Sequence, residues 1–337
     1  MATPPLSSSL ALARARGDDP SSCGFELCRH IVLGVRESKL NRPDLVLKYG
    51  THLIKQHQGA LSHEVWAMYE QVVVALLQQG RLGKKGATAP SAAATEAMTS
   101  AQEIIGKLNA QFPGSLRVKR LEAMMWEAKG EPELALGEYE EILQEDPSNI
   151  LALKRQVAVY RSLGRAADAA KRLVAFLDTF CSDPEAWSML HELYLSQQQY
   201  KRAAFCVEEL VLINPMAYIY HLRAGEIMYT LGMSPSGSHD QLLTARKYFA
   251  HALELKPEGC LRALYGVLLV CAALGASSKG KGIKVDTAEL LAHVQPQLVK
   301  CYTPAGPNAK PHPMRPLVMA LIKKLQAVGE ASASKAA

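Results

Sequence analysis

The sequence has no apolar run long enough to cross a membrane. Its longest apolar stretch, residues 263–276, is interrupted by Tyr265 and Gly266, and it falls short of the roughly 20 residues that a spanning helix needs. Residues 6–16 mix Ser, Leu, Ala and Arg and lack the continuous apolar core of a secretory signal peptide. The sequence therefore predicts a protein that is at most peripheral to a membrane.

Paired cysteines are absent as well. The seven cysteines are scattered along the chain without a Cys-x-x-Cys motif, which argues against a disulfide scaffold and favours a reducing compartment. Cys28 and His30 have no second ligand pair at the spacing of a zinc site. We therefore expect no bound metal ion and no other cofactor.

Signatures of catalysis are missing too. The chain has no Gly-x-Ser-x-Gly, no His-Glu-x-x-His and no dinucleotide-binding fingerprint. Its Gly-Lys-Lys-Gly run at residues 83–86 lacks the spacing and the preceding strand of a phosphate-binding loop. The ten histidines form no pattern with carboxylates or cysteines that indicates a site. The sequence predicts no catalytic residue and a protein that is not an enzyme.

What the chain does have is a repeat. Pro113 and Pro147 each follow a short amphipathic segment, and they are 34 residues apart, the period of a tetratricopeptide array in which every unit is two antiparallel helices. The unit from Trp187 to Pro215 shows the pattern most fully, and only His191, where the motif prefers Gly, departs from it. The sequence predicts an all-α fold, a superhelical tetratricopeptide solenoid of antiparallel helix pairs.

The spacing inside a unit has a mechanical reason. Trp187, Leu190 and Tyr194 recur at intervals of three and four residues, so they share one face of a first helix. A small residue such as Ala203 lets the second helix approach closely, and bulky residues fill the space beside it. The positions expected to pack the repeats are Ala101, Ala135, Tyr139, Ala169, Trp187, Leu190, Tyr194, Ala203, Ala245 and Phe249.

Composition divides the chain into five parts. Residues 1–24 are rich in Pro, Ser and Ala and are expected to form a disordered tail, with an organelle transit peptide as the alternative because no acid precedes Asp18. The helices of 25–82 begin the solenoid, 83–96 form a flexible insertion loop, and 97–274 hold the repeat array. Residues 275–337 contain a linker, helices that either cap the stack or dock a partner, and a disordered tail.

Charge is distributed unevenly along the chain. Residues 131–146 carry seven acids and no base, whereas residues 279–335 carry nine bases against three acids. One interpretation is that both segments are solvent-exposed faces or tails. The more specific interpretation is that the basic end attracts an acidic partner or an anionic membrane surface. Tyr302 is the sole aromatic residue of that basic end, so base stacking and a nucleic-acid partner are not expected.

The first helices of such an array line a concave groove. This predicted partner groove is basic at one end and acidic at the other, although a solvated face would also carry charge. Met124 and Ala158 stand where a chaperone-receptor clamp requires Asn, which disfavours that class of groove. The groove residues expected from the helical register are, from the basic to the acidic end, Arg117, Arg120, Met124, Lys154, Glu192 and Glu226.

Several segments resemble subunit 2 of the ER membrane protein complex. Phe112-Pro-Gly-Ser and Ala204-Phe-Cys are not part of the repeat consensus, so they make the resemblance specific. It extends over roughly residues 60–270 and departs from the family pattern in the insertion at 83–94 and in the region after Gly275. The segments that carry it are 65–72, 111–121, 142–149, 183–187, 200–210 and 245–253.

The resemblance implies a non-catalytic scaffold on the cytoplasmic face of the endoplasmic reticulum membrane. In this family the array cradles cytosolic segments of the transmembrane subunits and binds a further soluble subunit. The complex inserts tail-anchored and multi-pass membrane proteins, so the chain is expected to be one component of a hetero-oligomer. The alternative is a soluble tetratricopeptide co-chaperone or adaptor that binds chaperone or receptor tails.

Overall fold

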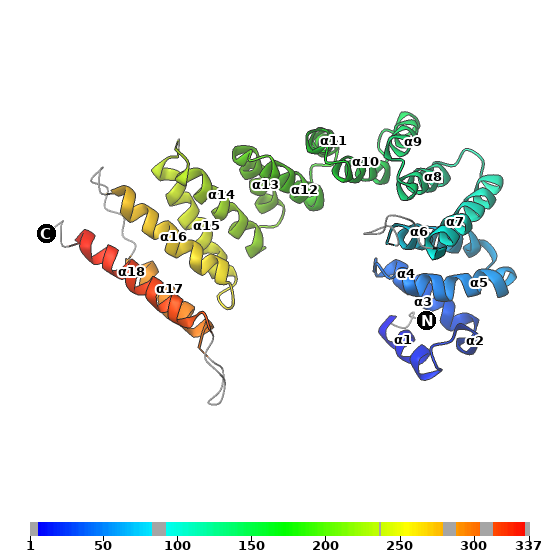
Figure 1. Cartoon of the computed structure of the whole chain (residues 1–337), viewed down its shortest axis with the longest axis horizontal. Coiled ribbons are helices and arrows are strands. Elements are labelled where there is room, and N and C mark those ends of the chain that lie inside the picture. The colour runs from blue at the N-terminus through cyan, green and yellow to red at the C-terminus, as the bar shows by residue number, and fades with distance from the viewer. Residues whose placement is uncertain (1–5, 83–91, 236, 279–287, 304–312, 334–337) are drawn as a thin grey trace. The chain divides into compact units, whose positions relative to one another are not determined.

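The computed structural model describes residues 6–82, 92–235, 237–278, 288–303 and 313–333. All regular structure in these ranges is helical, which confirms the all-α prediction. The chain divides into two compact units, Met1–Arg165 and Ala166–Ala337, and the helices of both are labelled in Figure 1.

The first unit is a series of helices in which neighbours in sequence pack against each other. One continuous apolar cluster runs through it from Ala13 to Ala128. A π-helical turn at Val46–Gly50 and a 3-10 turn at Gln58–Glu64 join the shorter elements. The α-helices are α1 (Leu6–Ala15), α2 (Pro20–Cys23), α3 (Phe25–Glu37), α4 (Pro43–Leu45), α5 (Thr51–Gln56), α6 (Val65–Leu82), α7 (Ala92–Gln111), α8 (Leu116–Lys129), α9 (Pro132–Glu145) and α10 (Ile150–Ser162).

Helices α1 and α2 correct the expectation of a disordered tail over residues 6–23, and residues 1–5 of that expected tail lie outside the described residues. α1 packs against α3, and Ala13 on α1 is fully buried. The Asp18 carboxylate accepts hydrogen bonds from the Tyr49 hydroxyl at 2.6 Å and from the Lys48 amine at 2.9 Å. Apolar burial and these polar contacts offset the entropy that a Ser- and Ala-rich segment loses on folding.

The second unit continues the same arrangement of helix hairpins. α16 packs against both α17 and α18, and Val318 and Ile322 of α18 are buried in the same cluster as the apolar face of α16. This last helix therefore covers the side of α16. The helices are α11 (Ala166–Thr179), α12 (Pro184–Ser196), α13 (Tyr200–Ile213), α14 (Tyr218–Met233), α15 (His239–Leu255), α16 (Leu261–Ser278), α17 (Ala288–Cys301) and α18 (Arg315–Ala333).

Two expected boundaries shift by a few residues. α7 begins at Ala92, so residues 92–96 are helical, and α16 continues to Ser278. The rest of the expected insertion loop, 83–91, and of the expected linker, 279–282, lies outside the described residues. None of the helices in the described part of the chain is long and apolar enough to span a membrane.

Helices end shortly before prolines, as the sequence predicts. A proline cannot donate a backbone hydrogen bond, and the residue before it avoids the helical conformation. Both effects end a helix shortly before the proline. Four helices end two residues before one: α7 before Pro113, α9 before Pro147, α13 before Pro215 and α15 before Pro257.

The positions expected to pack the repeats divide into two groups. Trp187 and Tyr194 are only half-buried. The Trp187 indole N–H donates to the carbonyl oxygen of Cys181 at 2.7 Å, and its ring meets Phe205 edge to face at 5.9 Å. The other eight positions are at most 2% exposed: Ala101, Ala135, Tyr139, Ala169, Leu190, Ala203, Ala245 and Phe249.

Phe249 shows how tightly the second unit is packed. Its ring lies between α14 and α16, where both neighbours are glycine. A Cβ atom on Gly225 would lie 2.9 Å from the ring, and one on Gly266 would lie 2.6 Å from it. These contacts are too short for carbon atoms, so the aromatic ring fits only because neither glycine has a side chain.

Gly266→Ala is expected to lower the free energy of unfolding. Overpacking a rigid ring costs about 1–3 kcal/mol, and the better helix propensity of alanine returns about 1 kcal/mol, which leaves a net loss of up to about 2 kcal/mol. The matched control is Gly275→Ala on the same helix, where the added Cβ meets nothing within 4 Å. Chemical denaturation measures both, and equal midpoints for the two variants would contradict this packing.

Candidate functional site

The predicted groove residues lie on the first helices of successive hairpins. Arg117, Arg120 and Met124 lie on α8 and Lys154 on α10, all in the first unit. In the second unit, Glu192 lies on α12 and Glu226 on α14. The structure brings Arg117 and Arg120 to a common partner, which the sequence did not reveal.

That partner is Glu70 on α6. The Arg120 guanidinium donates to its carboxylate at 2.6 Å, and Arg117 donates to the other carboxylate oxygen. The side chains of Glu70 and Arg120 are both 16% exposed, whereas that of Arg117 is 67% exposed. Arg120 therefore joins α8 to α6 inside the unit, and Arg117 keeps most of its surface open to a partner.

Met124 and Lys154 occupy the neighbouring positions. Met124 is half-buried and packs against the apolar cluster of the first unit. Lys154 is half-buried on α10. Within the basic half of the predicted groove, Arg117 is thus the most accessible cation. Charge reversal at either arginine would break a contact with Glu70, and the contact of Arg120 is the more buried of the two.

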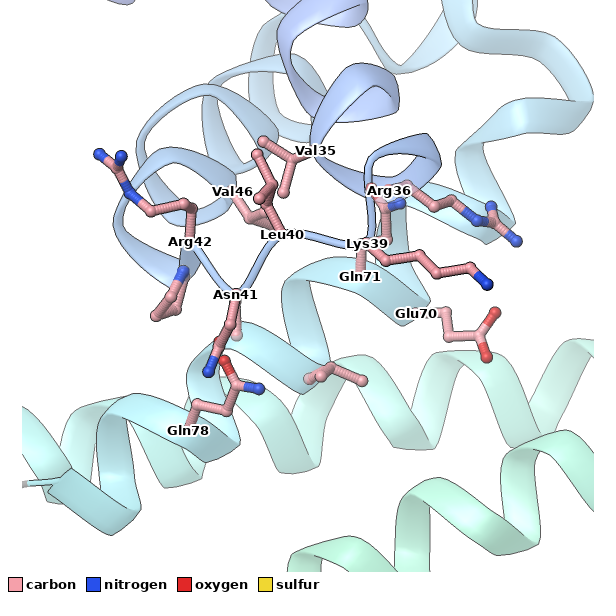
Figure 2. Close-up of a pocket in the computed structure, with 13 residues that line it drawn as sticks. Val35, Arg36, Lys39, Leu40, Asn41, Arg42, Val46, Glu70, Gln71 and Gln78 are labelled. Atoms are coloured by element: carbon pink, nitrogen blue, oxygen red, sulfur yellow. The ribbon is translucent and has the colours of Figure 1, made fainter. Parts of the chain in front are cut away.

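A cavity of about 400 Å³ adjoins Glu70 on the side of α3. Its walls come from the end of α3, the segment that follows it, and α6. In Figure 2 the charged groups of Arg36, Lys39 and Glu70 lie at one end and the amides of Asn41 and Gln78 at the other. The volume is within the range of small ligand sites.

The electrostatics of this cavity are strongly positive. Arg42 pairs with Asp44 at 2.8 Å, and Glu70 is shared by two arginines. Five cations and two carboxylates therefore line the cavity or contact its lining, which leaves three cations in excess: Arg36, Lys39, Arg42, Arg117 and Arg120 against Asp44 and Glu70.

Between α8, α9 and α10 lies a second ionic contact of the first unit. The Glu127 side chain is only 3% exposed. It accepts hydrogen bonds from the Arg155 guanidinium at 3.0 and 3.1 Å and from the Tyr139 hydroxyl at 2.7 Å. Burial, followed by the nearby Glu127 carboxylate, raises the pKa of Tyr139 above its ordinary value. The group is structural, because it joins three packed helices around a buried carboxylate.

The two acidic groove residues of the second unit differ from each other. Glu226 accepts two hydrogen bonds from the Arg262 guanidinium, at 2.9 and 2.7 Å. Glu192 is exposed on α12. Arg262 therefore neutralises part of the acidic end expected from the sequence, and Glu192 contributes the more accessible carboxylate.

The described residues offer little for chemical catalysis. Burial raises the pKa of Cys206 to about 12 and the pKa of Cys28 and of Cys271 to about 11, so these thiols stay protonated and are poor nucleophiles at neutral pH. Burial lowers the pKa of His191, whose Nδ1 lies 3.2 Å from the carbonyl oxygen of Ala203. Nowhere in the described ranges do three metal-binding side chains gather. The arrangement is suited to binding.

Sequence reasoning missed Glu70, Arg36 and Lys39. Glu70 precedes Arg117 by 47 residues and Arg120 by 50 residues, so no local spacing connects them. One signal was available: the spacing of three between Arg117 and Arg120 places both on one side of a helix, where a shared carboxylate is a natural partner. Nothing in the local sequence pointed to Arg36 or Lys39.

A stack of helix hairpins with small residues at the crossings defines a tetratricopeptide-type solenoid. A solved tetratricopeptide-repeat protein from Cytophaga hutchinsonii matches this fold with a TM-score of 0.52. The match covers 88% of this chain and 99% of that one at 11% sequence identity, so it supports the fold alone.

Sequence comparisons give the family. The family described as the EMC2 TPR-like repeat domain matches residues 110–242. The chain is 36% identical over 272 residues to ER membrane protein complex subunit 2 of Xenopus tropicalis, a match that covers 80% of this chain and 84% of the relative. It is 29% identical over 290 residues to the protein of the same name in Dictyostelium discoideum, covering 82% and 83%. The chain belongs to the family of ER membrane protein complex subunit 2.

Proposed function

We propose that this protein is a non-catalytic scaffold subunit of an ER membrane protein complex, on the cytoplasmic face of the membrane. Its array holds cytosolic segments of the transmembrane subunits and contacts a soluble subunit. In this way it supports the insertion of tail-anchored and multi-pass membrane proteins. The observation that carries the proposal is the match to 84% of the length of a subunit 2 relative, on a fold made of binding surfaces.

The groove proposal rests on the first helices within each unit, α8 and α10 in the first unit and α12 and α14 in the second. Arg117 is largely exposed beside Glu70, and Glu192 is exposed on α12. Such residues attract oppositely charged partner segments and fix their register, and salt weakens these contacts. Partner segments are therefore expected to carry acids that face Arg117 and Lys154, and bases that face Glu192 and Glu226.

Capture of the tagged full chain from detergent-solubilised endoplasmic reticulum membranes tests the proposal. Transmembrane subunits are expected in fixed stoichiometry with the chain. Abundant chaperones in place of those subunits would instead identify a co-chaperone and overturn the scaffold assignment. A monodisperse chain that captures no membrane subunit would overturn it as well.

Charge reversal tests the groove. The pair Arg117→Glu and Lys154→Glu is expected to reduce the captured membrane subunits roughly five-fold, because each reversal turns an attraction into a repulsion. The control pair Lys55→Glu and Lys107→Glu changes the net charge equally at two exposed positions of the same unit. Quantitative immunoblotting at low and high salt compares the two. Equal capture by both pairs would remove the groove from the proposal while leaving the scaffold role in place.

A further inference from the structure

The cavity beside Glu70 holds two cations without an acidic partner. Arg36 lies in the last turn of α3, and Lys39 follows it, both exposed at the cavity rim. Among the described residues neither one contacts a carboxylate, since the Glu70 carboxylate binds Arg117 and Arg120. Two adjacent cations repel each other, and a bound anion relieves that repulsion.

Lys39 is held in place by the backbone. Its φ of +50° is left-handed, a conformation that is unfavourable for a residue other than glycine. The amide N–H of Leu40 donates to the carbonyl oxygen of Val35 at 3.1 Å, which closes the end of α3. This turn sets the backbone position of Lys39, and Figure 2 shows its side chain at the same end of the cavity as that of Arg36.

The remaining walls of the cavity are suited to a peptide. Val35, Val46 and Ala75 are buried and form an apolar base. The amides of Asn41 and Gln78 line the opposite end from the cations (Figure 2). Side-chain amides both donate and accept hydrogen bonds, as a peptide backbone requires.

We propose that this cavity binds an acidic peptide segment of a partner protein. A Glu or Asp carboxylate of the segment binds Arg36 and Lys39, and an aliphatic neighbour lies on the apolar base. Asn41 and Gln78 hydrogen-bond the peptide backbone. The inference goes beyond the proposed function, because the site is formed by α3, the following segment and α6, and lies outside the predicted groove.

Other anionic ligands fit this cavity less well. No aromatic side chain lines it, so it offers no stacking surface for a nucleobase. Its apolar base is limited to a few aliphatic side chains, which suits one amino-acid side chain better than a lipid acyl chain. Inorganic phosphate and anionic vesicles share only the charge of the peptide, and so they serve as competing probes.

Glu70 gives the site an internal test. Its carboxylate lines the cavity and binds Arg117 and Arg120, so it repels an incoming acid and occupies two cations. Glu70→Gln removes the negative charge and loosens both arginines. It is therefore expected to bind the acidic peptide about three-fold more tightly, whereas a purely structural role for Glu70 would give no gain in affinity.

Fluorescence anisotropy with the full chain tests the proposal. The probe is a labelled, terminally blocked Val-Glu-Leu-Glu peptide, and Val-Gln-Leu-Gln is its neutral match. The double variant Arg36→Gln with Lys39→Gly removes both cations and keeps the fold, because glycine adopts the left-handed conformation at position 39 without strain. Its Kd is expected to rise about ten-fold or more, while the control Lys55→Gln with Lys107→Gln binds like the unmodified chain.

Three results would overturn the proposal. The first is equal affinity for the acidic peptide and its neutral match. The second is equal binding by the double variant and its control. The third is preferential binding of phosphatidylserine vesicles or inorganic phosphate over the peptide, which would assign the cations to an anionic surface or ion. None of these results affects the capture of membrane subunits, so failure here is distinguishable from failure of the scaffold role.

Discussion

Replacing Ala203 with glutamate is expected to lower the free energy of unfolding by about 3–5 kcal/mol, the sum of overpacking and of burying a carboxyl group without a partner. Ala203 has no exposed surface and packs in one cluster with Val207 on its own helix and with Ala224 and Ile227 on α14. Its carbonyl oxygen lies 3.2 Å from Nδ1 of His191 on α12. A longer side chain at this position forces apart the helices that meet here.

Lys201→Glu is the matched control for Ala203→Glu. Lys201 is exposed on α13, two residues away, so the same side chain is introduced into water and not into the packed interface. Its effect is expected within about 0.5 kcal/mol. Urea denaturation followed by circular dichroism measures both variants. A midpoint for Ala203→Glu equal to that of the control would show that the helix pairs pack in a different register.

Replacing Glu127 with alanine is expected to cost about 3–5 kcal/mol, the range for breaking a buried ion pair by removing one partner. The substitution removes the carboxylate that binds the Arg155 guanidinium. It also removes the hydrogen-bond acceptor of the Tyr139 hydroxyl. Because these residues join α8, α9 and α10, the loss is expected throughout the end of the first unit.

The comparison for Glu127→Ala is Glu145→Ala. Glu145 binds Lys119 at 2.6 Å, but its side chain is 52% exposed. Water replaces that contact, so the expected cost is about 0–1 kcal/mol. Thermal unfolding at equal protein concentration measures the difference between the two variants. If both lose the same stability, the Glu127 carboxylate is open to solvent and its assigned buried contact with Arg155 is incorrect.

The repeat fold was predictable because its signals are local. A proline two residues beyond a helix, as at Pro113 and Pro147, acts within one turn. A small residue such as Ala203 reports a close helix crossing at its own position. The helical segment at residues 6–23 was missed because its Ser, Ala and Pro content resembles a disordered tail, although Leu6 and Leu10 lie on the apolar side that packs against the cluster of the first unit.

The candidate site was less predictable because its contacts join distant parts of the chain. Helical register correctly placed Arg117 and Arg120 on one side of α8. Their partner Glu70 lies on α6, two helices earlier in the sequence. The cavity depends on the turn at Lys39, where a lysine takes a conformation that usually indicates glycine. Sequence patterns report periodicity along one helix, and they do not report which helices face each other.

The burial of the cysteines determines the order in which this protein is oxidised. Five of the seven are buried, and Cys181 and Cys301 are exposed. Oxidation to sulfenic acid begins from an accessible thiolate, so peroxide reaches the two surface thiols first and reaches the others only after a helix opens. Oxidation therefore begins at two cysteines that lie outside the packed core, and the five buried thiols react only when the helices around them unfold.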